Sequence, residues 1–205
     1  MLHNGYNVVS NIQQYIRYLD AAAFSWTTRC CYNASMQTAP IPENEGERIE
    51  SLKRLQILDT PPEERFDLLT KLATKVFNVP ISTITLVDSN REWFKSVCGL
   101  DEKEGDRAIS FCGHGMLADE ILVVPDAKKD PRFSDNPMVV GEPFIRFYAG
   151  VPLFSEDGQR VGTFCIKGHE PREITEEEKE TLIMMAKLAE LAINTHNLQL
   201  KSSKA

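Results

Sequence analysis

Apolar residues recur at helical spacing in the segment that precedes residue 80. Over residues 43–58 they return every three residues among charged side chains, which predicts an amphipathic helix with one buried face. Thr60 followed by Pro61 then predicts the N-cap and first turn of a second helix, which continues to about Phe77. The domain is therefore expected to begin with two consecutive helices.

Strand patterns follow these helices. Residues 81–88 are rich in β-branched side chains and predict a buried strand, and residues 91–97 predict its return arm in a hairpin. Trp93 and Phe94 in the return arm point to opposite faces, because successive strand side chains alternate. We therefore expect one ring in the core and the other free to line a cavity.

The middle of the chain mixes short elements with loops. Residues 99–109 are polar and predict a loop, Ser110 is a good N-cap for a short helix over residues 110–117, and residues 121–124 predict a short strand. A long irregular segment runs from 125 to 143. Connections of this length within a domain are usually functional or mobile, so binding residues are expected here.

A second hairpin and a long helix complete the pattern. Residues 145–154 and 160–167 predict two strands joined by a turn that contains an Asp-Gly pair. A capping box at residues 175–178 predicts the start of a final helix that runs towards Leu198. This order of elements predicts an α+β domain, with a central antiparallel sheet of about six strands flanked by helices.

The first 35 residues differ from the rest, because polar and aromatic residues alternate there without a sustained period. Met36 opens a far more regular stretch, and one hypothesis is that translation begins there. We assign residues 1–42 to a poorly ordered N-terminal extension, residues 43–200 to one domain and residues 201–205 to a tail.

Composition and charge narrow the functional classes. The chain has 205 residues, of which 42% are hydrophobic and 26% charged, proportions typical of a soluble globular protein. A net charge of −7 argues against a nucleic-acid partner. No apolar run is long enough to span a membrane. We therefore expect a cytoplasmic protein whose five cysteines are reduced.

The sequence also resembles a known family. Over about residues 43–200 it closely resembles bacterial GAF domains in the successive blocks ERIESLKRLQILDTPPEERFD, LVDSNREWFKSVCGLD, SFCGHGMLADEILVVPDAKKDPRFSDNPMV, IRFYAGVPL and GTFCIKG. The resemblance implies a sensory domain that binds a small molecule or a signalling partner, because GAF domains in different proteins serve different ligands. It also implies a histidine kinase, cyclase or phosphatase as partner in trans, since we recognise no output module in the sequence.

The resemblance places the ligand cavity between the sheet and the loops that correspond to residues 110–117 and 124–147. Carried over by position, the candidate lining residues are Trp93, Phe111, Cys112, His114, Asp126, Phe133, Arg146 and Tyr148. Aromatic rings around a few polar groups suit a small-molecule pocket, and a guanidinium suits a carboxylate or phosphate. Two alternatives remain open: the aromatic residues fill the core, and Arg146 forms an internal ion pair with Asp126 or another acidic neighbour.

Cysteine chemistry offers an enzymatic alternative. Free methionine-R-sulfoxide reductases are GAF-fold enzymes that use cysteines, and Cys98, Cys112 and Cys165 invite that comparison, although their spacing does not match well. Cys112 and His114 lie two residues apart, but no second pair stands at zinc-ligand spacing, so no metal is predicted. The sequence does not identify a cofactor, since it contains no bilin or haem attachment motif and no cyclic-nucleotide signature.

The terminal helices suggest a dimer. The last helix is apolar over more than one face, so that one stripe can pack on the sheet while the other meets a second subunit. The candidates for this contact, in a parallel helical bundle, are Ile49, Leu52, Leu55, Leu188, Leu191 and Leu198. We therefore expect a homodimer. The alternatives are that one subunit buries both stripes, or that the domain has kept its fold only for protein association.

Overall fold

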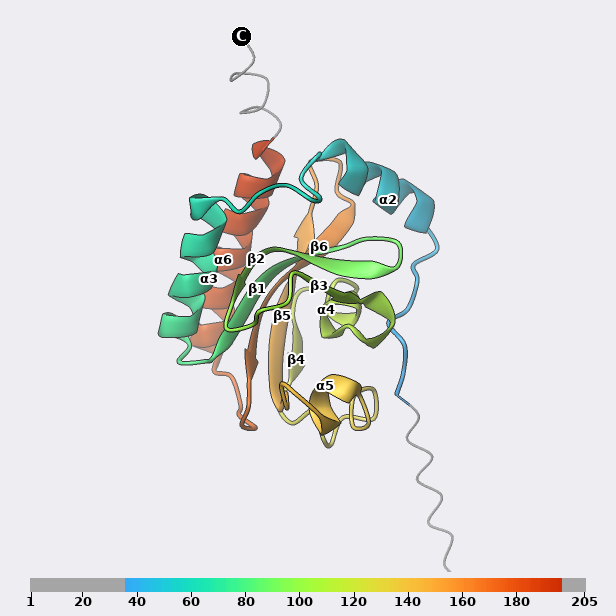
Figure 1. The fold of residues 1–205 in the computed structure, drawn as a ribbon. Coiled ribbons are helices and arrows are strands. Elements are labelled where there is room, and N and C mark those ends of the chain that lie inside the picture. Colours follow the sequence, from blue (N-terminus) through green and yellow to red (C-terminus); the bar gives the residue numbers. More distant parts are fainter. Residues whose placement is uncertain (1–35, 197–205) are drawn as a thin grey trace, which may run out of the picture. The chain divides into compact units, whose positions relative to one another are not determined.

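The computed structural model describes residues 36–196, and this part of the chain is an α+β domain built on one six-stranded sheet. The strands lie in the order β3-β2-β1-β6-β5-β4, and all neighbouring strands run antiparallel (Figure 1). The strand bounds are β1 Ile81–Val87, β2 Arg91–Cys98, β3 Glu104–Asp106, β4 Leu122–Val124, β5 Phe147–Phe154 and β6 Arg160–Gly168. The predicted fold class is confirmed, and so are both predicted hairpins.

Helices cover both faces of the sheet. Two of them, α3 and α6, lie side by side on one face, while α4, α5 and their loops cover the other (Figure 1). The helix bounds are α2 Glu45–Arg54, α3 Glu64–Val76, α4 Phe111–Gly115, α5 Pro137–Val140 and α6 Glu176–Asn194, with a 3₁₀ turn η1 at Arg107–Ile109. No helix within residues 36–196 is long and apolar enough to cross a membrane.

The alternation of strand side chains creates two separate cores. On β6, Phe164 and Ile166 belong to the cluster that packs beneath α3 and α6, whereas Cys165 between them belongs to a second cluster beneath α4 and α5. Full burial of a large apolar side chain contributes roughly 1.5–3 kcal/mol, so both clusters stabilise the fold. The second cluster lies where the sequence predicts the ligand cavity.

Side-chain caps set the start of two helices as predicted. Thr175 Oγ1 accepts a hydrogen bond from the Glu178 N–H at 3.2 Å, and the Glu178 carboxylate accepts one from the Thr175 N–H at 2.9 Å. Ser110 Oγ likewise accepts a hydrogen bond from the Gly113 N–H at 2.9 Å. The capping box of α6 and the N-cap of α4 are therefore confirmed.

The start of α3 was predicted wrongly. The helix begins at Glu64 rather than at Pro61. Thr60 does not cap it, because its hydroxyl donates to the Ile57 carbonyl at 2.7 Å and accepts a hydrogen bond from Lys95 at 2.7 Å. The loop predicted over residues 99–109 also differs, since it contains the short strand β3 and the turn η1.

Residues 36–42 contact the domain, although the sequence pattern assigns them to the extension. The Gln37 N–H donates to the Arg132 carbonyl at 3.2 Å, and the Ala39 N–H donates to the Ala108 carbonyl at 3.3 Å. Ala39 is also buried. The predicted extension is therefore too long at its C-terminal end. Residues 1–35 lie outside the described part, and the start at Met36 stays a prediction.

Candidate ligand site beneath helix α4

Three of the predicted lining residues form one aromatic stack on the α4 side of the sheet. Phe111 and Phe133 stack with their ring centroids 4.1 Å apart, and the Tyr148 ring lies 5.3 Å from that of Phe111. All three side chains are fully buried. The rings therefore fill much of the space between α4 and the sheet, so a ligand here has to bind to the polar groups around them.

Two glycines make room for the Tyr148 ring. A Cβ atom at Gly150, on the same strand and face, would lie 2.1 Å from the Tyr148 hydroxyl, and one at Gly115 on α4 would lie 2.4 Å from it. The hydroxyl is buried without a hydrogen-bond partner in the described structure. Tyr148 thus lies flat along β5, in the position where a larger residue at either glycine would clash.

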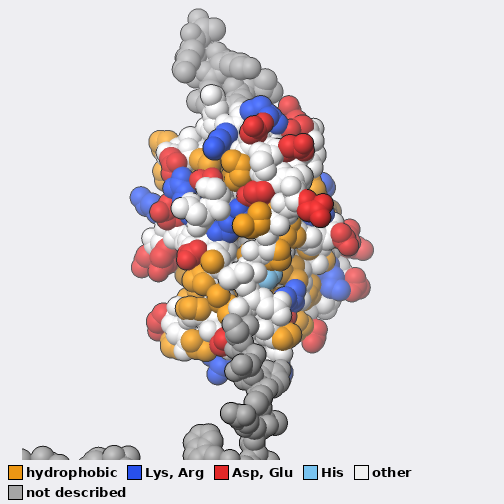
Figure 2. Space-filling model, turned by 90° about the vertical axis from the view of Figure 1, so that its right-hand side faces the viewer, with side chains coloured by type: hydrophobic (Ala, Val, Ile, Leu, Met, Phe, Trp, Pro, Cys, Tyr) orange, Lys and Arg blue, Asp and Glu red, His pale blue; other side chains and the backbone are white. Residues whose placement is uncertain are grey.

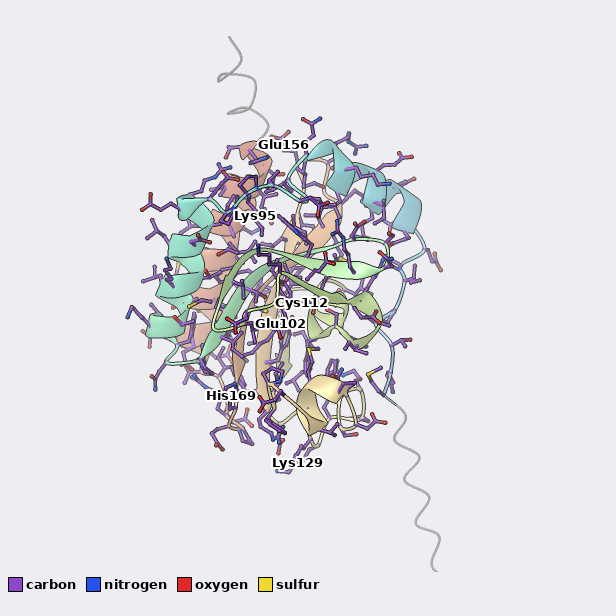
Figure 3. All side chains as sticks on the ribbon, in the orientation of Figure 1. Lys95, Glu102, Cys112, Lys129, Glu156 and His169 are labelled. Carbon is purple, nitrogen blue, oxygen red and sulfur yellow. The ribbon has the colours of Figure 1, made fainter. Side chains whose placement is uncertain are left out.

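A pair of thiols lies beside this ring. Cys112 Sγ on α4 is 3.5 Å from Cys165 Sγ on β6, and both side chains are fully buried. Figure 3 shows Cys112 near the centre of the molecule, where α4 meets the sheet. Burial alone would raise the pKa of Cys165, but a hydrogen bond from Cys112 and the ammonium of Lys167 lower it to about 7. Burial raises the pKa of Cys112 well above its usual value.

The third cysteine belongs elsewhere. Cys98 lies at the end of β2, partly exposed, with its Sγ 3.9 Å from the Thr74 hydroxyl of α3. Because α3 covers the opposite face of the sheet, the three cysteines considered for a reductase do not form one site. Within residues 36–196, no cluster of three or more His, Cys, Asp or Glu side chains could hold a metal ion.

Lys167 is the charged group that dominates this side of the sheet. Its side chain starts at the end of β6, is 1% exposed, and extends across β1 until Nζ is 5.7 Å from the centre of the Phe94 ring on β2. Among the described residues, no hydrogen bond or ion pair satisfies this ammonium. Burial lowers the pKa of Lys167, but the nearby acidic groups of Cys165, Cys112 and Glu92 outweigh it and raise the pKa overall.

Glu92 is the second buried ionisable group. It is 2% exposed, and the Ser110 hydroxyl donates a hydrogen bond to one carboxylate oxygen. Burial, together with Cys112, raises the pKa of Glu92 to about 8, although Lys167 opposes the rise. Glu92 is therefore mostly protonated at neutral pH. It forms no ion pair with Lys167, so no carboxylate of the described residues neutralises the buried ammonium.

Trp93 does not line this site. The two aromatic residues of β2 point to opposite faces as predicted, but Trp93 joins the cluster beneath α3 and α6, while Phe94 faces Lys167. Alternation alone could not decide which ring belongs to which face. Trp93 also borders an open groove of about 790 Å³ between the start of α3 and β2, together with Lys95 and Lys71.

The other polar candidates hold the loops in place. His114 Nε2 lies 3.0 Å from the Gln37 carbonyl and so fixes residues 36–42, while its ring packs edge-on against Phe133 with the ring centroids 4.9 Å apart. Asp126 forms an ion pair with Lys129 at 3.0 Å. Burial lowers the pKa of His114, which disfavours its charged form.

Arg146 also has a structural role. Its guanidinium donates to the carbonyls of Val139 at 2.7 Å and Ile145 at 3.0 Å. The predicted alternative, an ion pair with Asp126, is not formed. Arg146 instead closes the loop around α5, because carbonyl groups left free at the end of that short helix accept its hydrogen bonds.

The predicted dimer residues separate into two groups. Leu52 and Leu55 of the α2 segment are buried in the domain core and so are not available to a partner, and Ile49 is partly exposed. On α6, by contrast, Leu188 is 54% and Leu191 63% exposed. The last candidate, Leu198, lies outside residues 36–196.

Lys167 and Glu92 were missed by the sequence analysis. A signal was present, because Lys167 stands two residues after Cys165 in a strand and must therefore share its face. Glu92 stands two residues before Phe94 in the same way. Neither spacing reveals that these charged ends of the strands are covered by other residues.

Comparison with known proteins agrees with this architecture. The family model of the GAF domain matches residues 61–193, so the chain belongs to the GAF domain family. A cyclic di-GMP phosphodiesterase of Pseudomonas aeruginosa is 39% identical over 161 residues. The match covers 78% of this chain but 27% of that protein, so the chain spans about a quarter of the length of this relative.

Solved structures share the fold at lower identity. The GAF domain of a phosphoenolpyruvate-protein phosphotransferase from Acinetobacter has a TM-score of 0.56 at 18% identity, covering 74% of this chain and 95% of that one. A free methionine-R-sulfoxide reductase from Neisseria meningitidis, in complex with its substrate, has a TM-score of 0.54 at 17% identity, covering 82% and 99%. The predicted family is confirmed, and the domain is related to signalling proteins.

Proposed function

We propose that this GAF domain is a sensor that binds a small anionic ligand at Lys167 and passes the change to a signalling partner. The single observation that carries the proposal is the buried ammonium of Lys167, which forms no hydrogen bond or ion pair with any described residue. The identity to a cyclic di-GMP phosphodiesterase supports a role in controlling an enzyme of that kind, in the same chain or in another.

The energetic argument starts from the cost of the buried charge. An unpaired ammonium inside a protein typically costs several kcal/mol, and proteins retain such a group mainly at functional sites. Neutral Glu92 cannot offset the charge. The Phe94 ring contributes at most about 2 kcal/mol through its face. A bound anion would therefore be stabilised by its electrostatic attraction to the buried ammonium of Lys167.

The aromatic stack limits the size of this ligand. Phe111, Phe133 and Tyr148 occupy the space over the central strands, so the proposed ligand is a compact carboxylate or inorganic anion. The carboxyl of Glu92, which accepts a hydrogen bond from the Ser110 hydroxyl, lies on the same face and would hydrogen-bond to polar groups of the ligand. A protonated Glu92 would donate to an anion rather than repel it.

The ligand proposal predicts a thermal shift that depends on Lys167. We expect acetate, glycine or inorganic phosphate to raise the melting temperature of the dialysed full-length chain by several degrees in scanning fluorimetry. A ligand at a hundred times its Kd adds about 2.7 kcal/mol of stability. Lys167→Met should lose the shift. Lys129→Met, which removes a lysine side chain that is 83% exposed, should keep it.

Two results would contradict the ligand proposal. One is an equal shift in wild type and Lys167→Met. The other is a wild-type protein whose melting temperature no probe changes and whose native mass equals its denatured mass. That second result would favour the alternative of a domain kept for protein association.

We also propose that the domain is a homodimer that pairs through α3 and α6. Six large apolar side chains are exposed on the outer faces of these two neighbouring helices: Leu68, Leu72, Val76, Met184, Leu188 and Leu191. Their spacing of three or four residues places them on one stripe of each helix. A contiguous apolar surface of this kind commonly marks a protein interface.

The charges beside these stripes favour a second copy as the partner. The helices run antiparallel (Figure 1), so the N-terminal part of α6, with Glu177 and Glu180, lies beside the C-terminal half of α3, with Lys71 and Lys75. A twofold axis parallel to the helices would place α6 of one subunit on α3 of the other. The glutamates of α6 would then lie opposite the lysines of α3 in the second subunit.

The dimer proposal predicts that two changes on α6 separate the subunits. Leu188→Lys together with Leu191→Lys places like charges in the centre of the interface, and light scattering after size-exclusion chromatography should give the mass of one chain instead of two. Ile41→Lys is the matched control, because Ile41 is 69% exposed but lies outside both helices. A wild-type protein that is monomeric at every concentration would contradict the proposal.

A further inference from the structure

The two buried thiols beneath α4 are positioned to react with each other. Cys112 Sγ and Cys165 Sγ are 3.5 Å apart, and a disulfide requires about 2.05 Å, so the atoms need to approach by about 1.5 Å. One thiol lies on the five-residue helix α4 and the other in the central strand β6. We propose that Cys112 and Cys165 are a redox pair that a peroxide oxidises to a disulfide, which ties α4 to the sheet.

Cys165 is the residue suited to react first. Its Sγ lies 3.0 Å from the Thr83 hydroxyl and within hydrogen-bond reach of the Cys112 thiol, so two donors can stabilise a thiolate. Lys167 lies two residues along the same face of β6 and adds a positive charge. Reactive cysteines are found in such electropositive surroundings. The lowered pKa of Cys165, about 7, agrees with this geometry.

Cys112 is suited to the second step. Its Sγ lies 3.4 Å from the Thr85 hydroxyl, and burial raises its pKa, so it stays a thiol until its partner is oxidised. The other titratable groups that face the pair are Glu92 and Tyr148, and burial raises the pKa of both. Both are mostly neutral at pH 7. The positive charge of Lys167 therefore determines which of the two thiols ionises first.

The chemistry balances with hydrogen peroxide as the oxidant. The Cys165 thiolate attacks one peroxide oxygen, the S–O bond forms, the O–O bond breaks, and the leaving hydroxide takes a proton to become water. Cys112 sulfur then attacks the sulfenic sulfur of Cys165, the S–S bond forms, the S–O bond breaks, and a second water leaves. Two thiols lose two electrons and two protons in total, and peroxide gains both.

Access to the pair requires a local opening, because both thiols are fully buried. Peroxide is close to water in size, and α4 is a single short helix whose opening needs only part of the fold to loosen. The disulfide would then fix α4, whose Phe111 belongs to the aromatic stack. Redox state would thus control whether α4 can move, with or without a ligand at Lys167.

The test uses the full-length chain with Cys30, Cys31 and Cys98 replaced by serine, beside the wild type. Hydrogen peroxide should remove the mass of two hydrogens, and a non-reducing digest should contain a peptide pair joined through Cys112 and Cys165. Dithiothreitol should reverse both signals. Cys112→Ser should leave a sulfenic acid at Cys165 that dimedone labels, whereas Cys165→Ser should give neither product.

The rate of oxidation provides a second readout. Lys167→Met should slow disulfide formation at pH 7 by about fivefold, as for a thiol whose pKa rises by one unit from about 7, and the rate should recover at higher pH. A variant that unfolds would be detected by its circular dichroism and replaced by Cys112→Ala or Cys165→Ala. The proposal is overturned if a folded protein keeps both thiols titratable after peroxide, or if the linked peptides contain other cysteines.

Discussion

Lys167→Met is expected to stabilise the ligand-free domain by about 1–4 kcal/mol, whereas the same change at Lys95 is expected to destabilise it by about 1–3 kcal/mol. Both lysines are almost completely buried, and they differ in their partners. Lys95 Nζ donates to Thr60 Oγ1 at 2.7 Å and to the Pro61 carbonyl at 2.9 Å, and it pairs with Glu63 at 2.6 Å. Among the described residues, Lys167 has no hydrogen bond or ion pair, and its Nζ lies 5.7 Å from the centre of the Phe94 ring.

The opposite signs follow from what each substitution leaves behind. Methionine at position 167 removes an unpaired charge and keeps a flexible apolar side chain of similar length. Methionine at position 95 leaves the Thr60 hydroxyl and the Pro61 carbonyl without this donor, and it removes one of the three cationic groups beside Glu63, which keeps Arg65 and His196. A stabilising change at position 167 would mark a group that the domain keeps for function at the expense of stability.

Urea unfolding at pH 7 of the dialysed proteins measures both changes. The free energies of unfolding of the two variants should lie on opposite sides of the wild-type value with similar m-values. If Lys167→Met is destabilised as strongly as Lys95→Met, then Lys167 has a partner in solution and the argument for an anion at that position fails.

The sequence predicted helix starts and hairpins correctly where the residues that determine them are neighbours in the chain. The capping box of Thr175 and Glu178, the N-cap at Ser110 and the two hairpins depend on neighbouring residues, and each is confirmed. The start of α3 depends instead on a distant residue, because Lys95 on β2 hydrogen-bonds to Thr60 and Pro61 before the helix. A sequence window around Thr60 contains no trace of that contact.

The candidate site shows a similar division. The resemblance to GAF domains grouped Phe111, Cys112 and Tyr148 as lining residues, and the three do meet in one cluster on the α4 face of the sheet. It could not place Trp93, because the alternation of strand side chains does not decide whether Trp93 or Phe94 faces α4. The resemblance also could not show that His114 and Arg146 form hydrogen bonds to backbone carbonyls of loops. The paths of these loops depend on tertiary packing.

Exposure of the helices was also beyond the sequence pattern. The apolar stripe of α2 looked suitable for a partner, but Leu52 is buried in the domain itself. The second helix, α3, carries the exposed stripe with Leu68 and Leu72. Both helices are amphipathic, and periodicity alone does not state whether the apolar face meets its own sheet or another subunit.

Gly150→Ala is expected to destabilise the domain by about 3 kcal/mol, at the upper end of what overpacking usually costs. The added Cβ would lie 2.1 Å from the Tyr148 hydroxyl, 2.6 Å from the ring carbon that carries it, and 2.8 Å from a Thr163 methyl group. Tyr148 cannot rotate away without leaving its place against Phe111. The aromatic stack beneath α4 must therefore shift as a whole.

Two control substitutions distinguish the clash at Gly150 from other effects. One replaces a glycine elsewhere, and the other alters the Tyr148 side chain itself. Gly46→Ala on α2 adds a Cβ that meets no atom within 4 Å, and it should stabilise the helix by about 0.5–1 kcal/mol. Tyr148→Phe removes a buried hydroxyl that has no hydrogen-bond partner and should change stability by less than about 1 kcal/mol.

Chemical unfolding measures the free energy of unfolding of each variant. Near-ultraviolet circular dichroism reports the packing of the aromatic rings in the folded state. Gly150→Ala should lose stability and change the aromatic signal, while Gly46→Ala should leave that signal intact. If Gly150→Ala behaves like Gly46→Ala, then Tyr148 is free to move. The space beneath α4 would in that case open readily to a ligand larger than the compact anion proposed at Lys167.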